Sequence, residues 1–165
     1  MSEVKSLAGR RNVSVTGGLT AGFVATVVLS LLMMGKSALG LMPALNPIGD
    51  LNHVASSFVG MELPSPFGWV AHFLIGTVVW GIAYALLEPY LPGPAVIKGV
   101  VFGIFAWLAM MIVFMPVAGH GLFGAALGLP AVVATLGLHL VYGAVLGVTY
   151  PNVSGPPARS EVWPG

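Results

Sequence analysis

Two histidines within segments that otherwise suit a lipid bilayer are the residues whose chemistry stands out in this sequence. His72 lies in "GWVAHFLIGTVVWG" and His139 begins "HLVYGAVLGVTY". His72 precedes Tyr84 by 12 residues and His139 precedes Tyr150 by 11, which predicts similar depths in the membrane. Ionisable side chains within membrane spans almost always face the bundle interior, so we expect both imidazoles to point inward.

Two imidazoles at one depth are candidate cofactor ligands, either axial ligands of a haem b or ligands of copper together with methionine thioethers. The weaker candidates for metal ligands lie in the outer halves of the first and third predicted spans and in the outer turn after the third: His120, Met34, Met111 and Met115. An alternative interpretation is that neutral histidines only form hydrogen bonds between helices and that methionine only fills space. Proton or solute handling is a third hypothesis.

The other polar residues indicate less about function than the two histidines do. Lys36 follows Met33 by one turn and is expected to extend to the outer membrane surface, with contact to an anionic group as the alternative. The sequence has no phosphate-binding loop, no paired carboxylates and no nucleophile–base arrangement. It therefore does not favour an enzyme.

The elements that must position these residues follow from composition. The chain of 165 residues is 57% hydrophobic and 7% charged, against about 25% charged in soluble domains. Residues 99–158 contain no Asp, Glu, Lys or Arg, a stretch long enough for two crossings of about 20 residues each. The apolar residues run continuously, which favours helices over a barrel.

We therefore predict an all-α membrane protein, a single domain over 1–165 with spans at about 15–40, 67–90, 96–117 and 129–150. A short interfacial helix at about 50–61, beginning at Asp50 as its N-cap, is expected in the first outer loop because its apolar and polar residues separate onto two faces. His53 on its polar face is expected to be solvated. Residues 151–165 are expected to form a flexible tail.

The distribution of basic residues predicts the orientation. Lys and Arg favour the cytoplasmic side, and one side of the predicted topology holds most of them: Lys5, Arg10, Arg11, Lys98 and Arg159. Only Lys36 falls on the other side. Both termini are therefore expected in the cytoplasm, and the net charge of +1 indicates no nucleic-acid partner.

The sequence also indicates an internal repeat of one two-helix hairpin. "GLTAGFVA" at 18–25 and "GVVFGIFA" at 99–106 share the pattern Gly-x3-Gly-x2-Ala, and His-x3-Gly occurs in the second and the fourth span. Each copy has two spans, so the second copy re-enters the membrane in the same orientation, as a parallel repeat. The small residues share one helix face, which predicts close helix contacts.

Five segments together resemble a known family: "MMGKSALGLMP", "GWVAHFLIGTVVWGIAYALLEPYLPG", "KGVVFGIFAWLAMM", "MPVAGHGLFG" and "HLVYGAVLGVTY". The family comprises small bacterial four-span inner-membrane proteins catalogued as a domain of unknown function, and the resemblance covers about 17–150. It implies a bacterial inner-membrane location and carries no activity, substrate or site residue.

From these observations we expect a non-enzymatic accessory or assembly subunit of a respiratory or metal- or haem-handling system. The alternative is a small oligomeric channel or transporter for a small solute or ion. A bundle of this size exposes much of its helix surface, so besides the lipid bilayer a protein partner or a homo-oligomer is expected.

Overall fold

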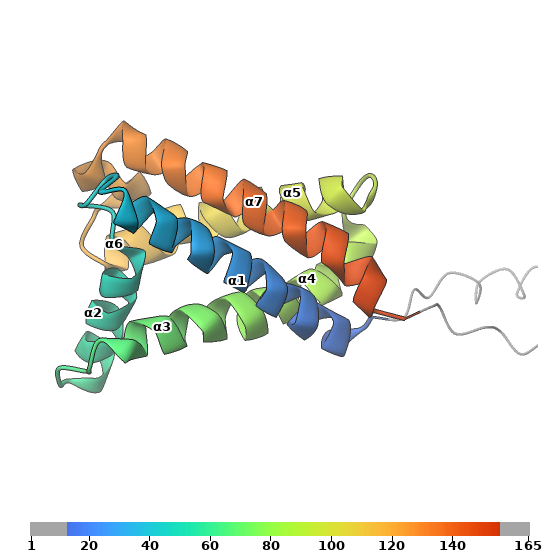
Figure 1. Ribbon diagram of the computed structural model, residues 1–165, viewed down its shortest axis with the longest axis horizontal. Coiled ribbons are helices and arrows are strands. Elements are labelled where there is room, and N and C mark those ends of the chain that lie inside the picture. The colour runs from blue at the N-terminus through green and yellow to red at the C-terminus, as the bar shows by residue number, and fades with distance from the viewer. Residues whose placement is uncertain (1–12, 156–165) are drawn as a thin grey trace, which may run out of the picture.

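The structure, a computed structural model, describes residues 13–155 and shows a bundle of helices (Figure 1). This part of the chain contains no strand. Four of its helical segments are long and apolar enough to cross a membrane: Val15–Ala38, Pro66–Tyr90, Ala95–Val117 and Leu129–Val153. The prediction of an all-α protein with four spans is confirmed, and the helices define a multi-pass membrane protein.

The two ends of the described chain lie at the same end of the bundle, here named the termini end (Figure 1). The opposite end carries helix α2 (Pro47–Val59) and is here named the α2 end. The first span, α1 (Val15–Ala38), and the fourth, α7 (Leu129–Val153), pack against each other through the middle of the bundle. Four of the basic residues that predicted the orientation lie outside the described residues: Lys5, Arg10, Arg11 and Arg159.

The second span is not a uniform α-helix. It runs through α3 (Pro66–Phe73), a π-helical segment η2 (Leu74–Val79), α4 (Trp80–Leu87) and a final 3₁₀ turn η3 (Glu88–Tyr90). At the end of η2 the Trp80 N–H donates to the carbonyl of Ile75, five residues back instead of four. A π turn of this kind accommodates one extra residue in a helix.

This extra residue explains the unequal spacing seen in the sequence. His72 and Tyr84 are separated by 12 residues, one more than His139 and Tyr150, and η2 lies between the first two. The rings of Tyr84 and Tyr150 nevertheless meet edge to face, with centroids 5.3 Å apart. The two spans therefore bring corresponding tyrosines together despite their different lengths.

The third span contains a second π-helical segment. It comprises α5 (Ala95–Ala109), the π segment η4 (Met110–Phe114) and α6 (Met115–Val117). Pro116 lacks an N–H, and its ring would clash with the carbonyl four residues earlier in a regular helix. The wider turn before Pro116, in which Met115 N–H donates to the Met110 carbonyl, relieves that clash.

The fourth span starts after the turn η5 (Leu122–Leu127), with Pro130 in its first turn. It ends later than predicted, because α7 continues through Pro151 to Val153. The predicted tail at 151–165 therefore begins with helix, and residues 156–165 lie outside the described part.

Helix α2 forms in the predicted loop but begins earlier than the expected residue 50. Its N-cap is Asn46, whose side chain accepts a hydrogen bond from Gly49 N–H at 3.1 Å. Pro47 occupies the first turn, where a missing N–H costs little. The prediction that Asp50 is the N-cap was therefore wrong, because Asp50 lies in the first turn of the helix.

The two faces of α2 partly follow the predicted pattern. His53 and Ser57 are exposed, whereas Ser56 is buried and its hydroxyl accepts a hydrogen bond from Leu63 N–H at 3.0 Å. Phe58 on the apolar face is 82% exposed, as suits a helix whose apolar side faces lipid.

Glycines bring the backbones together within each hairpin. A Cβ on Gly18 would lie against the carbonyl of Gly81, and a Cβ on Gly99 would lie against that of Gly143. The first contact joins spans one and two, and the second joins spans three and four. Close approach at small residues is a main source of helix packing in lipid, where the hydrophobic effect between helices is absent.

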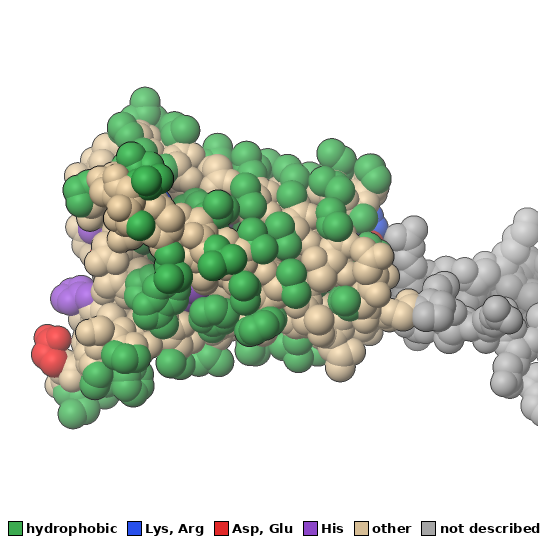
Figure 2. Space-filling model, in the orientation of Figure 1, with side chains coloured by type: hydrophobic (Ala, Val, Ile, Leu, Met, Phe, Trp, Pro, Cys, Tyr) green, Lys and Arg blue, Asp and Glu red, His purple; other side chains and the backbone are tan. Residues whose placement is uncertain are grey.

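The outer surface of the bundle is apolar over most of its length. Hydrophobic side chains are spread over the visible face between the two ends, and an acidic side chain and a histidine protrude at the α2 end (Figure 2). This distribution matches a protein whose middle section contacts acyl chains.

Candidate functional site: a cavity between the spans

A cavity of about 190 Å³ opens between the four spans beneath α2. Its walls include Pro47 and Leu51 of α2, so this helix covers part of it from the α2 end. The side chains of most chemical interest come from all four spans: Thr26, His72, Trp80, Ala106, His139 and Tyr142. Both histidines predicted to face the bundle interior therefore line one cavity.

His72 is held by a hydroxyl group on the first span. Its Nε2 lies 3.1 Å from Ser30 Oγ. The single hydrogen of that hydroxyl is donated to the Thr26 carbonyl at 2.8 Å, so Ser30 must accept from His72. In the neutral imidazole, this contact corresponds to the hydrogen on Nε2 and a lone pair on Nδ1.

His139 has the opposite tautomer. Its Nδ1 lies 2.8 Å from the carbonyl oxygen of Thr135, one turn earlier on α7. A carbonyl can only accept, so Nδ1 carries a hydrogen, and in the neutral imidazole Nε2 then carries the lone pair.

Tyr142 joins α7 to the π turn of the second span. Its hydroxyl donates to the carbonyl of Gly76 at 2.6 Å, and the tyrosine is 3% exposed. In a regular helix this carbonyl would accept from Trp80, whose N–H bonds instead to Ile75. Tyr142 therefore satisfies a carbonyl that the π turn releases, which matters because an unpaired polar group in lipid is costly.

The α7 wall of the cavity is fixed by a second threonine. Thr135 is 3% exposed and donates to a carbonyl of its own helix, that of Ala131 or Val132, at 2.9 Å. Its oxygen also accepts from Trp107 Nε1 at 3.3 Å. This bond ties the third span to the fourth beside the cavity.

The predicted methionine ligands lie apart from the two histidines. Met111 and Met115 are each 1% exposed and line a small space next to α7, whereas Met34 is 56% exposed on α1. None of these three lines the cavity. Within residues 13–155, no group of three or more His, Cys, Asp or Glu side chains could hold a metal ion.

His120 instead contacts the interfacial helix. Its Nε2 lies 3.0 Å from Asp50 Oδ1, which joins the turn before α7 to the first turn of α2. Its main-chain N–H also donates to the Met115 carbonyl at 2.9 Å. As a metal ligand, His120 stays a prediction.

Lys36 is engaged by main-chain oxygens at the α2 end. Its ammonium group donates to the Leu45 carbonyl at 2.6 Å and to that of Met42 at 3.1 Å. The lysine thereby holds the loop that leads to Asn46 and α2. Contact with an anionic group stays a prediction.

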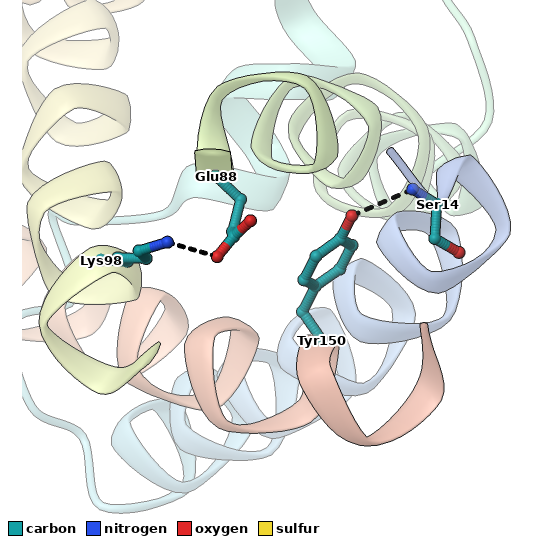
Figure 3. A network of polar contacts seen from close by, with 4 residues as sticks. All are labelled: Ser14, Glu88, Lys98 and Tyr150. Atoms are coloured by element: carbon teal, nitrogen blue, oxygen red, sulfur yellow. Dashed lines mark hydrogen bonds and ion pairs between the residues drawn. The ribbon is translucent and has the colours of Figure 1, made fainter. Parts of the chain in front are cut away.

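The termini end of the bundle is closed by polar contacts (Figure 3). Lys98 pairs with Glu88 at 2.5 Å across the turn between the second and third spans, and both side chains are mostly buried. The hydroxyl of Tyr150 accepts from Ser14 N–H at 3.1 Å, at the start of α1. The cavity is thus confined to the half of the bundle nearer α2.

Sequence reasoning found the histidines but missed the residues that orient them. Ser30 and Thr26 are four residues apart on the first span, as are Thr135 and His139 on the fourth. Spacing by one helical turn is the signal that could have indicated these contacts. The same spacing argument could have placed Tyr142 beside the cavity, since it follows His139 by three residues and shares its helix face.

The chain belongs to a family of unknown function, DUF6789, which matches residues 12–161. This match spans all of the described residues and confirms the coarser part of the resemblance seen in the sequence, namely membership of a family of unknown function. Neither a curated protein nor a solved structure matches the chain.

Proposed function

We propose that this protein is a non-enzymatic accessory protein, a single four-span domain, whose cavity binds a small and mostly apolar molecule within the membrane. The cavity between all four spans is the observation that carries the proposal. Ligand sites are typically apolar hollows with a few convergent polar groups, and here the polar groups are the two histidines and their hydroxyl partners.

The size of the cavity indicates the size of the ligand. An apolar protein cavity of about 150 Å³ accommodates benzene, and this cavity of about 190 Å³ is only slightly larger. Pockets for drug-sized ligands measure roughly 300–1,000 Å³. A single ring therefore suits the space better than a haem macrocycle.

Tryptophan fluorescence tests this proposal, because Trp80 lines the cavity. Titration of the detergent-solubilised protein with 4-bromotoluene should give saturable quenching through the bromine atom. The saturable component should vanish in Trp80→Phe and persist in Trp69→Phe, since Trp69 lies outside this cavity. Quenching that rises linearly and equally in all three proteins would contradict the proposal.

A cofactor role is the second candidate, favoured by the two imidazoles that each keep one lone pair beside the same cavity. Haem b or copper in the purified protein would be visible by absorbance and by metal analysis. A Soret band or stoichiometric copper would replace the small-ligand proposal with this one.

The proposed location is the bacterial inner membrane, with both termini in the cytoplasm. The chain has no cysteine, so single cysteines can report its orientation. A membrane-impermeant maleimide applied to intact cells should label Ser57→Cys on α2 and should not label Asn152→Cys at the end of α7. The reverse pattern would invert the proposed orientation.

The accessory role includes association with a protein partner or with a second copy of the chain. In-membrane cross-linking from Val133→Cys, a 60% exposed position on the surface of α7, tests for such a neighbour. The channel alternative would instead require a polar path along the bundle, and the glycine contacts and the polar closure at the termini end argue against one through a single copy.

A further inference from the structure

The hydroxyl groups that line the cavity already donate their hydrogens to main-chain carbonyls. The pairs are Thr26 with Gly22, Tyr142 with Gly76 and Thr135 with Ala131, at 2.7, 2.6 and 2.9 Å. His72 likewise donates to Ser30. Within the described residues, the indole N–H of Trp80 is the lining side-chain donor left without a partner.

Acceptors, in contrast, remain available. His139 Nε2 forms no hydrogen bond within the described part of the chain, because the tautomer set by Thr135 leaves it a bare lone pair. It is also not among the fully enclosed side-chain atoms that lack a partner, so part of its surface stays accessible. Nε2 is the ring nitrogen farther from the main chain, and His139 lines the cavity.

The walls around this acceptor favour an aromatic ring. Trp80, Phe114 and Tyr142 all line the cavity with the two imidazoles. Aromatic rings attract one another in edge-to-face and offset arrangements beyond the contribution of area alone. The volume, as argued above, suits one six-membered ring.

From these observations we propose that the ligand is a monocyclic phenol whose hydroxyl group donates a hydrogen bond to His139 Nε2. This inference rests on the proposed function and specifies the ligand of the same cavity. A hydroxyl group is a donor as well as an acceptor, so it supplies the hydrogen that the His139 lone pair can accept. An ether or ketone oxygen offers no hydrogen to His139.

The test compares two molecules of nearly equal shape, 4-bromophenol and 4-bromotoluene, by the quenching assay described above. The ratio of their dissociation constants in the wild-type protein is compared with the ratio in His139→Leu, which keeps the volume of the side chain but removes the acceptor. Loss of one hydrogen bond should reduce the preference for the phenol by roughly three- to tenfold. Partitioning into detergent affects both proteins equally and cancels in this comparison.

His53→Leu is the matched control, since His53 is exposed on α2 away from the cavity. It should leave the ratio unchanged. An unchanged ratio in His139→Leu, with 4-bromotoluene still binding saturably, would overturn the phenol and leave the small-ligand proposal standing. Absence of saturable binding for both molecules would overturn both.

A second measurement uses the unmodified chain and does not depend on a variant that folds. In protein labelled with ¹⁵N at histidine, 4-bromophenol should shift the His139 Nε2 resonance in the direction of an acceptor that receives a hydrogen bond. The toluene should leave it nearly unchanged. Equal shifts with both molecules would overturn the assignment of His139 as the acceptor.

Discussion

The two halves of this bundle are packed in different ways. In the half near the termini end, glycine backbones touch directly, as between Gly18 and Gly81, and a buried ion pair closes the turn. In the half near α2 the glycine stripes give way to larger side chains such as Thr26 and Met110, and the cavity opens between them. Close packing in one half thus fixes the helices, while the other half has room for a ligand.

The ion pair of the closed half should give the largest effect on stability. Glu88→Ala leaves Lys98, which is 7% exposed, without its partner at 2.5 Å. Breaking a buried pair in this way costs about 3 kcal/mol, measured as the free energy of unfolding in mixed micelles. Glu62→Ala, at an exposed position at the α2 end, should change it by less than about 0.5 kcal/mol. Equal effects would show that the ion pair contributes nothing specific.

The glycine contacts should come next. Gly99→Ala places a Cβ against the Gly143 carbonyl and should cost about 1–3 kcal/mol of stability as the helices separate. Gly137→Ala is the matched control on α7, because nothing lies within 4 Å of its added Cβ. It should be neutral or stabilising by up to about 1 kcal/mol. If both substitutions behave alike in thermal unfolding, direct backbone contact is not what holds the hairpins.

The smallest effect is expected at the boundary between the two halves. Tyr142→Phe removes the donor to the Gly76 carbonyl at 2.6 Å and should cost about 0.6–1.5 kcal/mol. The amide I band of protein carrying a ¹³C=O label at Gly76 should shift upward as that hydrogen bond is lost. Tyr90→Phe, at an 84% exposed position, should change neither quantity. An unshifted Gly76 band would mean that another donor satisfies this carbonyl.

Much of the fold was predictable from the sequence, because the free energy of placing residues in lipid depends mainly on composition. The four spans and the glycine faces follow from runs of apolar and small residues, and the structure places Gly18 and Gly99 in close helix contacts as expected. The inward direction of His72 and His139 followed from the cost of exposing an imidazole to lipid.

The details of the site were less predictable. The π turns depend on which carbonyl each N–H selects, and that choice is made by neighbours such as Tyr142 and Pro116, which sequence spacing alone does not bring together. Helix α2 starts earlier than predicted because Asn46 can cap the helix as well as Asp50 can, and Pro47 favours the earlier position. The hydroxyl group that contacts His72 belongs to Ser30 on another span, so only the tertiary structure could identify this partner.

The π turn in the second span has a consequence for comparing the two halves of the chain with each other. His72 with His139, and Gly76 with Gly143, align at an offset of 67 residues, whereas Tyr84 with Tyr150, and Gly81 with Gly147, align at 66. A single gap placed within Leu74–Val79 reconciles them. Any internal alignment without this gap will match one set and lose the other, and will underestimate the similarity of the two hairpins.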